Sequence, residues 1–274
     1  MSFYTSLSGL KASQTDMSVI SNNIANAGSV GFKRSKAQFG DIFAASPTQS
    51  SKMVAGQGTR LNGITQQFTQ GTYESSEKTL DLAIIGEGLF IVKGEPPREQ
   101  VSYTRNGSFD TIDGFVVDTT GAKLQLLPVD AAGNVTDNTL AGAFDFQLPT
   151  GAPSDPTSAL VNVTIGLDGL VTATFANGED QALGKVAMAT FPTMSGLRPT
   201  GDAHWQSTGE SGPPTIDAAT NGPMGAIRSG ALERSNVDIT EELVMLMAAQ
   251  RNFQANAKAI EGASQLTQTI IGMR

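Results

Sequence analysis

The sequence predicts a mixed α and β fold: N- and C-terminal helices that form an antiparallel coiled coil, with an all-β module between them. Two patterns predict it. Apolar residues recur every seven positions at both ends of the chain, whereas the middle alternates short apolar runs with glycine-based turns. A repeat of seven is typical of a coiled-coil seam, and the second pattern is typical of β-hairpins.

The N-terminal helix is predicted from Ser2 to about Ala27, before the helix-breaking Gly28 and Gly31. Steps of seven residues start at Phe3, and further apolar residues flank them. The predicted assembly seam of this helix is therefore Phe3, Leu7, Leu10, Met17, Ile20 and Ile24. Most other positions are small or uncharged polar residues, so the helix needs a partner to bury its apolar stripe.

The C-terminal helix has a predicted start, because Asp238 followed by Glu241 has the spacing of a capping box. Its seam is predicted at Ile239, Leu243, Leu246, Phe253, Ile260 and Ile270. We expect the two helices to pack against each other and then against further copies of the chain. Two ordinary amphipathic helices on a globular core are the alternative interpretation.

These patterns divide the chain into three predicted parts. Residues 1–32 and 235–274 form a helical coiled-coil core domain, and residues 33–75 form an extended connector. Residues 76–234 form a β-rich outer module, with a small second β subdomain considered at about 131–220. Within it, Asp168-Gly169 lies between the strand-like runs Val161–Ile165 and Leu170–Phe175, which is a strong hairpin signal.

Composition excludes several classes of function. The chain has no cysteine and one histidine, which excludes disulfides, cysteine-based zinc sites and clusters of several histidines. The net charge is −8, and residues 61–228 alone carry −11, which argues against a nucleic-acid partner. The small basic cluster Lys33, Arg34 and Lys36 is interpreted as solvated or as lying at a helix end. No apolar run is long enough for membrane insertion, and the first residues do not resemble a cleaved signal peptide.

No motif assigns a catalytic, cofactor-binding or metal-binding residue. Gly86-Glu87-Gly88 lacks the third glycine of a dinucleotide loop and is interpreted as a turn. The aspartates Asp110, Asp113 and Asp118 lack the alternating ligands of a calcium loop and are interpreted as turn residues. We therefore expect no cofactor, no metal and no enzymatic activity.

Trp205, beside His204, has two interpretations. A sugar-stacking platform is one, and an aromatic anchor for a polar loop is the other, which we favour because the chain has only one tryptophan.

The segment SNNIANAGSVGFKRS, from Ser21 to Ser35, resembles the N-terminal signature of flagellar axial proteins of the rod, hook and hook-associated classes. Its motif residues here are Asn22, Asn23, Asn26, Gly31 and Phe32. The resemblance continues through GITQQFTQG (63–71), LDLAIIGEGLF (80–90), YTRNGSF (103–109) and SNVDITEELVMLMAAQR (235–251). The opening MSFYTSLSGL and the run FGDIFAAS (39–46) are most similar to the hook protein.

The resemblance implies a subunit of the bacterial flagellar hook, which polymerises into a hollow helical tube and transmits torque as a flexible universal joint between rod and filament. It also implies an extracellular location in the hook and basal body, reached without a cleaved signal peptide. The implied partners are further copies of the chain, other axial proteins (rod, hook-associated proteins and hook cap) and the type III export apparatus.

Two other functions remain open at this point. Hook proteins usually carry an additional outer β-domain, for which residues 131–220 are too few, so a distal or proximal rod subunit is the first alternative. A β-rich carbohydrate-binding or hydrolytic domain with helical oligomerisation arms is the second.

Overall fold

The structure is a computed structural model that describes residues 2–43, 56–95, 100–130, 133–155 and 157–272. The chain divides into two compact units. We call Met1–Ala27, Arg34–Gln67 and Val237–Arg274 the helical unit, and Gly28–Lys33 with Phe68–Asn236 the β unit. Each unit is therefore built from segments that are far apart in the sequence.

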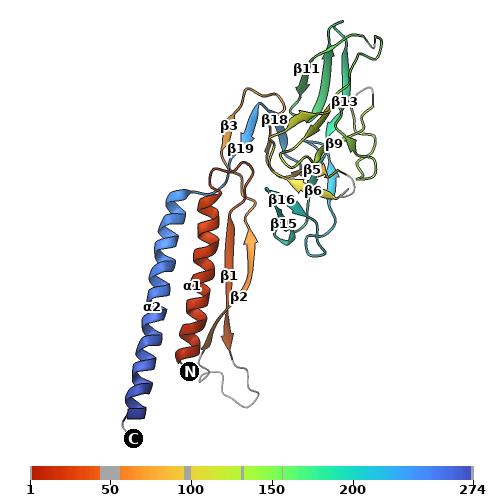
Figure 1. Ribbon diagram of the computed structural model, residues 1–274. Helices are drawn as coiled ribbons and strands as arrows, with labels where there is room; N and C mark the ends of the chain where they lie inside the picture. Colours follow the sequence, from red (N-terminus) through yellow and green to blue (C-terminus); the bar gives the residue numbers. More distant parts are fainter. Residues whose placement is uncertain (1, 44–55, 96–99, 131–132, 156, 273–274) are drawn as a thin grey trace. The chain divides into compact units, whose positions relative to one another are not determined.

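The helical unit consists of two long helices and a β-hairpin. Helix α1 (Ser2–Ala25) and helix α2 (Ile239–Gly272) run antiparallel, and α1 also packs against strands β1 (Ser35–Phe43) and β2 (Gly56–Gln66) (Figure 1). The two strands pair antiparallel, from Ser35 opposite Gln66 to Phe43 opposite Gly56. Much of the expected connector 33–75 thus forms a strand pair, whose register shifts between Gln38 and Phe39 and between Asp41 and Phe43. Residues 44–55 of the connector lie outside the described part of the chain.

Asp238 caps the start of α2. Its Oδ1 accepts hydrogen bonds from the backbone N–H groups of Thr240, at 2.8 Å, and Glu241, at 3.2 Å. These are two of the N–H groups that a helix leaves without an internal partner, so an aspartate here favours a helix that begins at Ile239. The predicted start of the second helix is confirmed.

The predicted coiled coil is wrong, although the combination of two terminal helices with a β-rich middle agrees with the expectation. Of the twelve predicted seam residues only Ile20 is buried, with 4% of its surface exposed, whereas Phe3, Ile239, Leu243 and Ile270 are 44–70% exposed. The residues that α1 and α2 do bury are Ser13, Val19, Ile20, Asn23, Glu242 and Ala249. The physical reason is the hairpin: α1 packs against two neighbours, so its buried face differs from the seven-residue seam.

The β unit is built on one branched 13-stranded sheet. Its main path runs β11-β12-β13-β9-β5-β6-β16-β15, with β7, β8, β10, β14 and β17 attached to it, and two further pairs, β18–β4 and β19–β3, lie outside it. The strand bounds are β3 Tyr73–Ser75, β4 Leu82–Ile85, β5 Leu89–Lys93, β6 Val101–Thr104, β7 Asp110–Ile112, β8 Phe115–Val117, β9 Lys123–Leu127, β10 Phe144–Asp145, β11 Leu160–Ile165, β12 Leu170–Phe175, β13 Asp180–Val186, β14 Met188–Thr190, β15 Arg198–Gly201, β16 His204–Gln206, β17 Thr215–Asp217, β18 Ala226–Ser229 and β19 Ala231–Glu233.

The sequence pattern explains these strands. Along β12, Val171, Ala173 and Phe175 are buried and alternate with half-buried residues, which is the period of a strand with one face on a core. Strands β11 and β12 pair antiparallel across the turn that contains Gly169, whose φ is +78°, so the predicted Asp-Gly hairpin is confirmed. In the central strand β5 every residue except the half-buried Lys93 is buried, and Phe90 and Val92 belong to the largest apolar cluster.

Candidate functional site: a polar network and a groove in the helical unit

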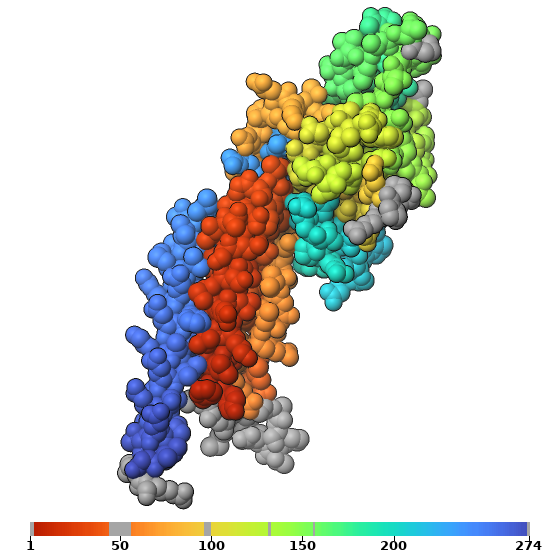
Figure 2. Space-filling model, in the orientation of Figure 1, coloured from red at the N-terminus to blue at the C-terminus, as the bar shows by residue number. Residues whose placement is uncertain are grey.

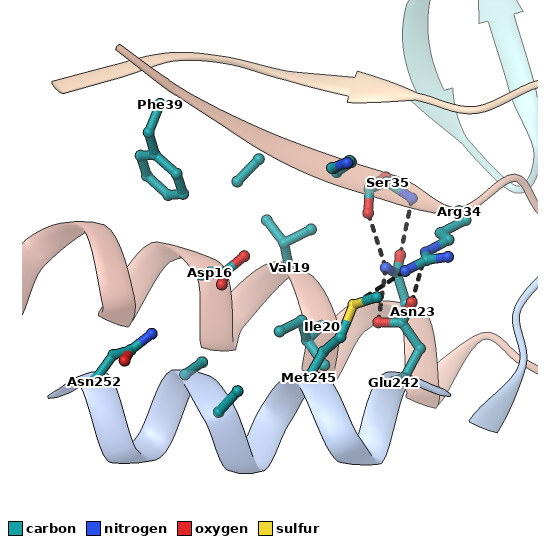
Figure 3. Close-up of a pocket in the computed structure, with 14 residues that line it drawn as sticks. Asp16, Val19, Ile20, Asn23, Arg34, Ser35, Phe39, Glu242, Met245 and Asn252 are labelled. Carbon is teal, nitrogen blue, oxygen red and sulfur yellow. Dashed lines mark hydrogen bonds and ion pairs between the residues drawn. The ribbon is translucent and has the colours of Figure 1, made fainter. Parts of the chain in front are cut away.

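Asn23 joins α1 to both of its neighbours in the helical unit. Its side-chain Nδ2 donates to the carbonyl of Ser35 at 2.8 Å, and its Oδ1 accepts from the N–H of Ser35 at 2.9 Å. Nδ2 also donates to Glu242 Oε2 on α2 at 3.2 Å (Figure 3). Only 1% of Asn23 is exposed, so these bonds form in a dry site where an unpaired polar group is unfavourable.

Glu242 is the acidic centre of the same network. It is 1% exposed, and Arg34 Nε lies 2.6 Å from its Oε1. Arg34 also reaches Glu241 Oε1 at 3.2 Å and donates to Met245 Sδ at 3.1 Å. A buried carboxylate requires such a partner, so the Arg34 side chain belongs to the packing of α2 rather than to a solvated basic patch.

A groove of about 280 Å³ lies between α1, α2 and β1, next to this network. Val19 and Ile20 on α1, Phe39 on β1 and Met245 on α2 contribute apolar surface, and Asp16 and Asn252 contribute polar groups (Figure 3). Burial raises the pKa of Asp16, and the charge of Lys36 partly opposes this. The residues that line the groove therefore offer mainly apolar packing surface beside a few polar groups.

The other predicted seam residues lie along the two helices without forming a common buried row. Leu7, Leu10, Met17, Ile24, Leu246, Phe253 and Ile260 are half-buried. Gln14 on α1 and Gln250 on α2 are both exposed. The single chain therefore leaves a large part of the apolar surface of α1 and α2 open to solvent.

The motif residues of the flagellar resemblance have identifiable structural tasks. The backbone carbonyl of Asn22 accepts bonds from the N–H and the Nδ2 of Asn26, which closes the last turn of α1. Gly31, in the β unit, has a φ of +69°, and a Cβ there would lie 2.5 Å from the backbone nitrogen of Asn106. Phe32 is half-buried. The side chain of Asn23 bonds Ser35 and Glu242 and so links α1 to β1 and to α2.

The β unit contains a buried ionic cluster that sequence reasoning missed. Glu233, fully buried, receives Lys33 Nζ on Oε1 at 2.7 Å and Arg105 Nε on Oε2 at 2.6 Å. The N–H of Gly71 also donates to Oε1, at 2.9 Å. Lys33 is 2% exposed, so its interpretation as a solvated residue is wrong. A single sequence does not show that a lysine and a glutamate 200 positions apart are partners.

Mutual attraction in this cluster outweighs the effect of burial on the acid. Burial by itself would raise the pKa of Glu233, but the charges of Arg105 and Lys33 hold that pKa below its ordinary value. Burial lowers the pKa of Lys33, against the opposing attraction of Glu233. Arg105 also donates to the carbonyls of Ile84, Gly86 and Gly88, which fixes the Gly86-Glu87-Gly88 segment as a turn.

His204 forms a second buried pair in the β unit. Its Nε2 lies 2.6 Å from Asp118 Oδ2, and its Nδ1 lies 2.8 Å from the carbonyl of Asp202. Burial alone would lower the pKa of His204, but the bond to Asp118 and its charge raise the pKa overall. The neighbouring Trp205 is 2% exposed and its ring lies 5.2 Å from that of Phe68, so it is a core aromatic.

The described residues contain no group of acidic and histidine side chains that could hold a metal ion. Neither helix, over the residues described, has an apolar stretch of the length needed to cross a bilayer.

Comparisons with known proteins agree with this architecture. Residues 3–33 match the family model "Flagella basal body rod protein", residues 83–173 match "Flagellar hook protein FlgE/F/G D1 domain", and residues 228–273 match "Flagellar basal body rod FlgEFG protein C-terminal". The flagellar basal-body rod protein FlgG of Bacillus subtilis is 33% identical over 287 residues, covering 100% of this chain and 98% of its own. The flagellar hook protein FlgE of Escherichia coli is 26% identical over 411 residues, covering 100% of both.

A crystal structure of the Helicobacter pylori flagellar hook protein FlgE2 has a TM-score of 0.25 at 14% identity, over 65% of this chain and 44% of that chain. So weak a similarity carries no argument about the fold.

The relatives that cover the whole chain are structural proteins of the flagellum. The chain belongs to the family of flagellar rod and hook proteins and is a structural subunit of the flagellar axis.

Proposed function

We propose that the chain is a subunit of the flagellar hook, which polymerises into a hollow helical tube and transmits torque as a flexible joint between rod and filament. The observation that supports this proposal best is the surface of α1 and α2. Predicted assembly residues such as Phe3, Leu243 and Ile270 are 44%, 46% and 70% exposed in the single chain, which leaves them available to other copies. Exposed apolar patches of this kind are typical of assembly surfaces.

The proposal includes the route and the partners. The subunit is exported unfolded by the type III apparatus and functions outside the cell. Its contacts are with further copies and with other axial proteins, including rod proteins, hook-associated proteins and the hook cap. It has no enzymatic role. A chain without cysteine suits this route, because it forms no disulfide before or during passage through a narrow channel.

Polymerisation is tested directly with the purified chain. We expect it to form sedimentable helical polymers, visible by electron microscopy, as its concentration rises. The substitution Leu243→Asp places a charge on an exposed apolar position and should abolish the polymer while leaving the melting of the monomer unchanged. Ala255→Asp, at another exposed site further along α2, is the matched control. Polymers of normal length from Leu243→Asp would contradict the proposal.

A rod subunit is the second candidate, and the lengths of the alignments favour it. The FlgG relatives from Bacillus subtilis and Agrobacterium fabrum align over 287 and 276 residues, close to the 274 residues of this chain. The FlgE relatives need 411 or 416 aligned positions, so they carry long segments that this chain lacks. Electron microscopy of a deletion strain separates the two: rods without hooks indicate a hook subunit, and loss of both indicates a rod subunit.

A further inference from the structure

Among the residues that the structure describes, the end of α2 has no partner helix within the helical unit. Asn23 on α1 faces Glu242 on α2. Gly9, fourteen residues earlier on α1, faces Asn256, fourteen residues later on α2, so the antiparallel register is the same at both places. At this register the first residue of α1, Ser2, is level with Ala263. Every residue from Ser264 to Gly272 is exposed, and this segment, which we call the α2 tip, extends past α1 in the space-filling view (Figure 2).

The α2 tip continues the side of the helix that packs on α1. Ile260, Ala263, Thr267 and Ile270 follow one another at intervals of three, four and three residues, which places them on one side of a helix. Leu266, Ile270 and Ile271 are 67%, 70% and 69% exposed. No residue from Gly262 to Gly272 is charged. The tip is therefore an uncharged surface with exposed apolar residues, and none of the described residues of the helical unit covers it.

A second exposed apolar surface lies at the start of the same helix. Ile239, Leu243, Leu246 and Met247 have the i, i+4, i+7, i+8 spacing of a helical stripe, which we call the α2 base stripe. Three of its members, Ile239, Leu243 and Met247, are 52%, 46% and 49% exposed. The stripe and the tip are each about 12 Å long at about 1.5 Å per residue, so one can cover the other.

We propose that the α2 tip of one copy packs on the α2 base stripe of a second copy. The inference rests on the proposed self-assembly and adds the pair of surfaces that carries it. Each copy uses two different surfaces, which is a heterologous contact. Such a contact generates an open helical filament when the rotation between copies does not close into a ring. A contact between two tips would instead close a dimer and stop growth. Because the chain carries a net charge of −8, copies repel one another, and an uncharged tip reduces this repulsion where they meet.

Cysteine cross-linking tests the contact, since the natural chain has no cysteine to interfere. Three full-length variants are needed: Leu243→Cys, Ile270→Cys and the double variant with both. The control is the double variant Ala255→Cys with Ile270→Cys, because Ala255 is exposed on α2 but lies off the base stripe. Each variant is oxidised under polymerising conditions and separated by non-reducing electrophoresis. Sedimentation of the unoxidised samples measures polymer formation independently.

The proposal expects a ladder of covalent dimers, trimers and longer species from the Leu243→Cys, Ile270→Cys double variant. A mixture of the two single variants should stop at dimers, while each single variant alone and the Ala255 control should stay monomeric. Dimers from Ile270→Cys alone would show that tips pair with tips, and would overturn the inference. Sedimentable polymers without any ladder would also overturn it but leave the proposed function standing. Wild-type chain that never sediments would refute the proposed function itself.

Discussion

Asn23 and Ser35 form a reciprocal pair in which a side-chain amide bonds both the carbonyl and the N–H of one backbone residue, at 2.8 and 2.9 Å. The amide therefore makes with the first residue of β1 the pair of hydrogen bonds that a residue of a neighbouring strand would make. Its third bond, to Glu242, brings in α2. One short side chain thus ties together three segments that are distant in sequence.

Asn23→Ala should destabilise the helical unit by about 1–3 kcal/mol for each buried group left unpaired. The groups concerned are the N–H and C=O of Ser35 and Oε2 of Glu242, whose Oε1 keeps its contact with Arg34. Faster hydrogen exchange at the Ser35 amide, together with a lower free energy of unfolding, is the expected result. Asn22→Ala, one position away and exposed, is the control and should change little. Equal effects of the two substitutions would show that the Asn23 pair is unimportant.

Glu233→Gln should destabilise the β unit by about 3–5 kcal/mol, because it leaves Lys33 and Arg105 as buried cations without their counter-charge. Denaturant titration followed by Trp205 fluorescence reports on this unit. The comparison is Glu74→Gln, which removes an exposed ion pair with Arg234 and should change stability by about 0–1 kcal/mol. The prediction fails if the two variants unfold at the same denaturant concentration.

The β unit should lose stability as pH rises above the ordinary pKa of histidine. The folded pKa of His204 is raised above 6.5, so the contribution of its protonated form is complete below 6.5 and disappears as pH rises through the folded pKa. The pKa of Asp118 is held below 3.8 despite burial, so its contribution is lost only as pH falls through that lower value. His204→Gln should remove the difference in stability between about pH 5 and about pH 8.

The chain offers a direct check of this prediction, since it has one histidine and therefore one imidazole signal by NMR. Titration of that signal measures the pKa of His204 in the folded protein. Asp118→Asn should bring the value down, because the carboxylate is what raises it. A folded pKa at or below 6.5 in the natural chain would disprove the predicted pH dependence.

Gly31→Ala should destabilise the β unit by at least about 1–3 kcal/mol, the range for a strained backbone position. The φ of Gly31 is +69°, and its new Cβ would collide with the backbone of Arg105 and Asn106. Gly28→Ala is a close control, because a Cβ there meets nothing within 4 Å and no positive φ is involved. Thermal melting of both variants should separate them clearly, and a matching loss for Gly28→Ala would rule out this explanation.

Patterns within short stretches of sequence correctly predicted the structural features that depend only on neighbouring residues. The cap at Asp238, the turn at Asp168-Gly169 and the alternation along β12 each depend on residues within a few positions of one another. The seven-residue seam failed for the opposite reason. It assumed that α1 has one neighbour, whereas β1 and β2 also pack on it and change which side is buried. Nothing in the spacing of Phe3, Leu10 and Met17 reveals a hairpin that follows later in the chain.

The amino-acid sequence by itself determined the two terminal helices, the strand-rich middle and the family motif, because periodicity, caps and turn residues act over short distances. Only the tertiary structure decided which charges are buried. The sequence suggested that Lys33 is a solvated residue, whereas the structure pairs it with the buried Glu233. The sequence likewise placed Asn23 near the end of a helix, and the structure bonds its side chain to Ser35 and Glu242. Partners of this kind meet through folding of distant segments, and their energies depend on the loss of water around them.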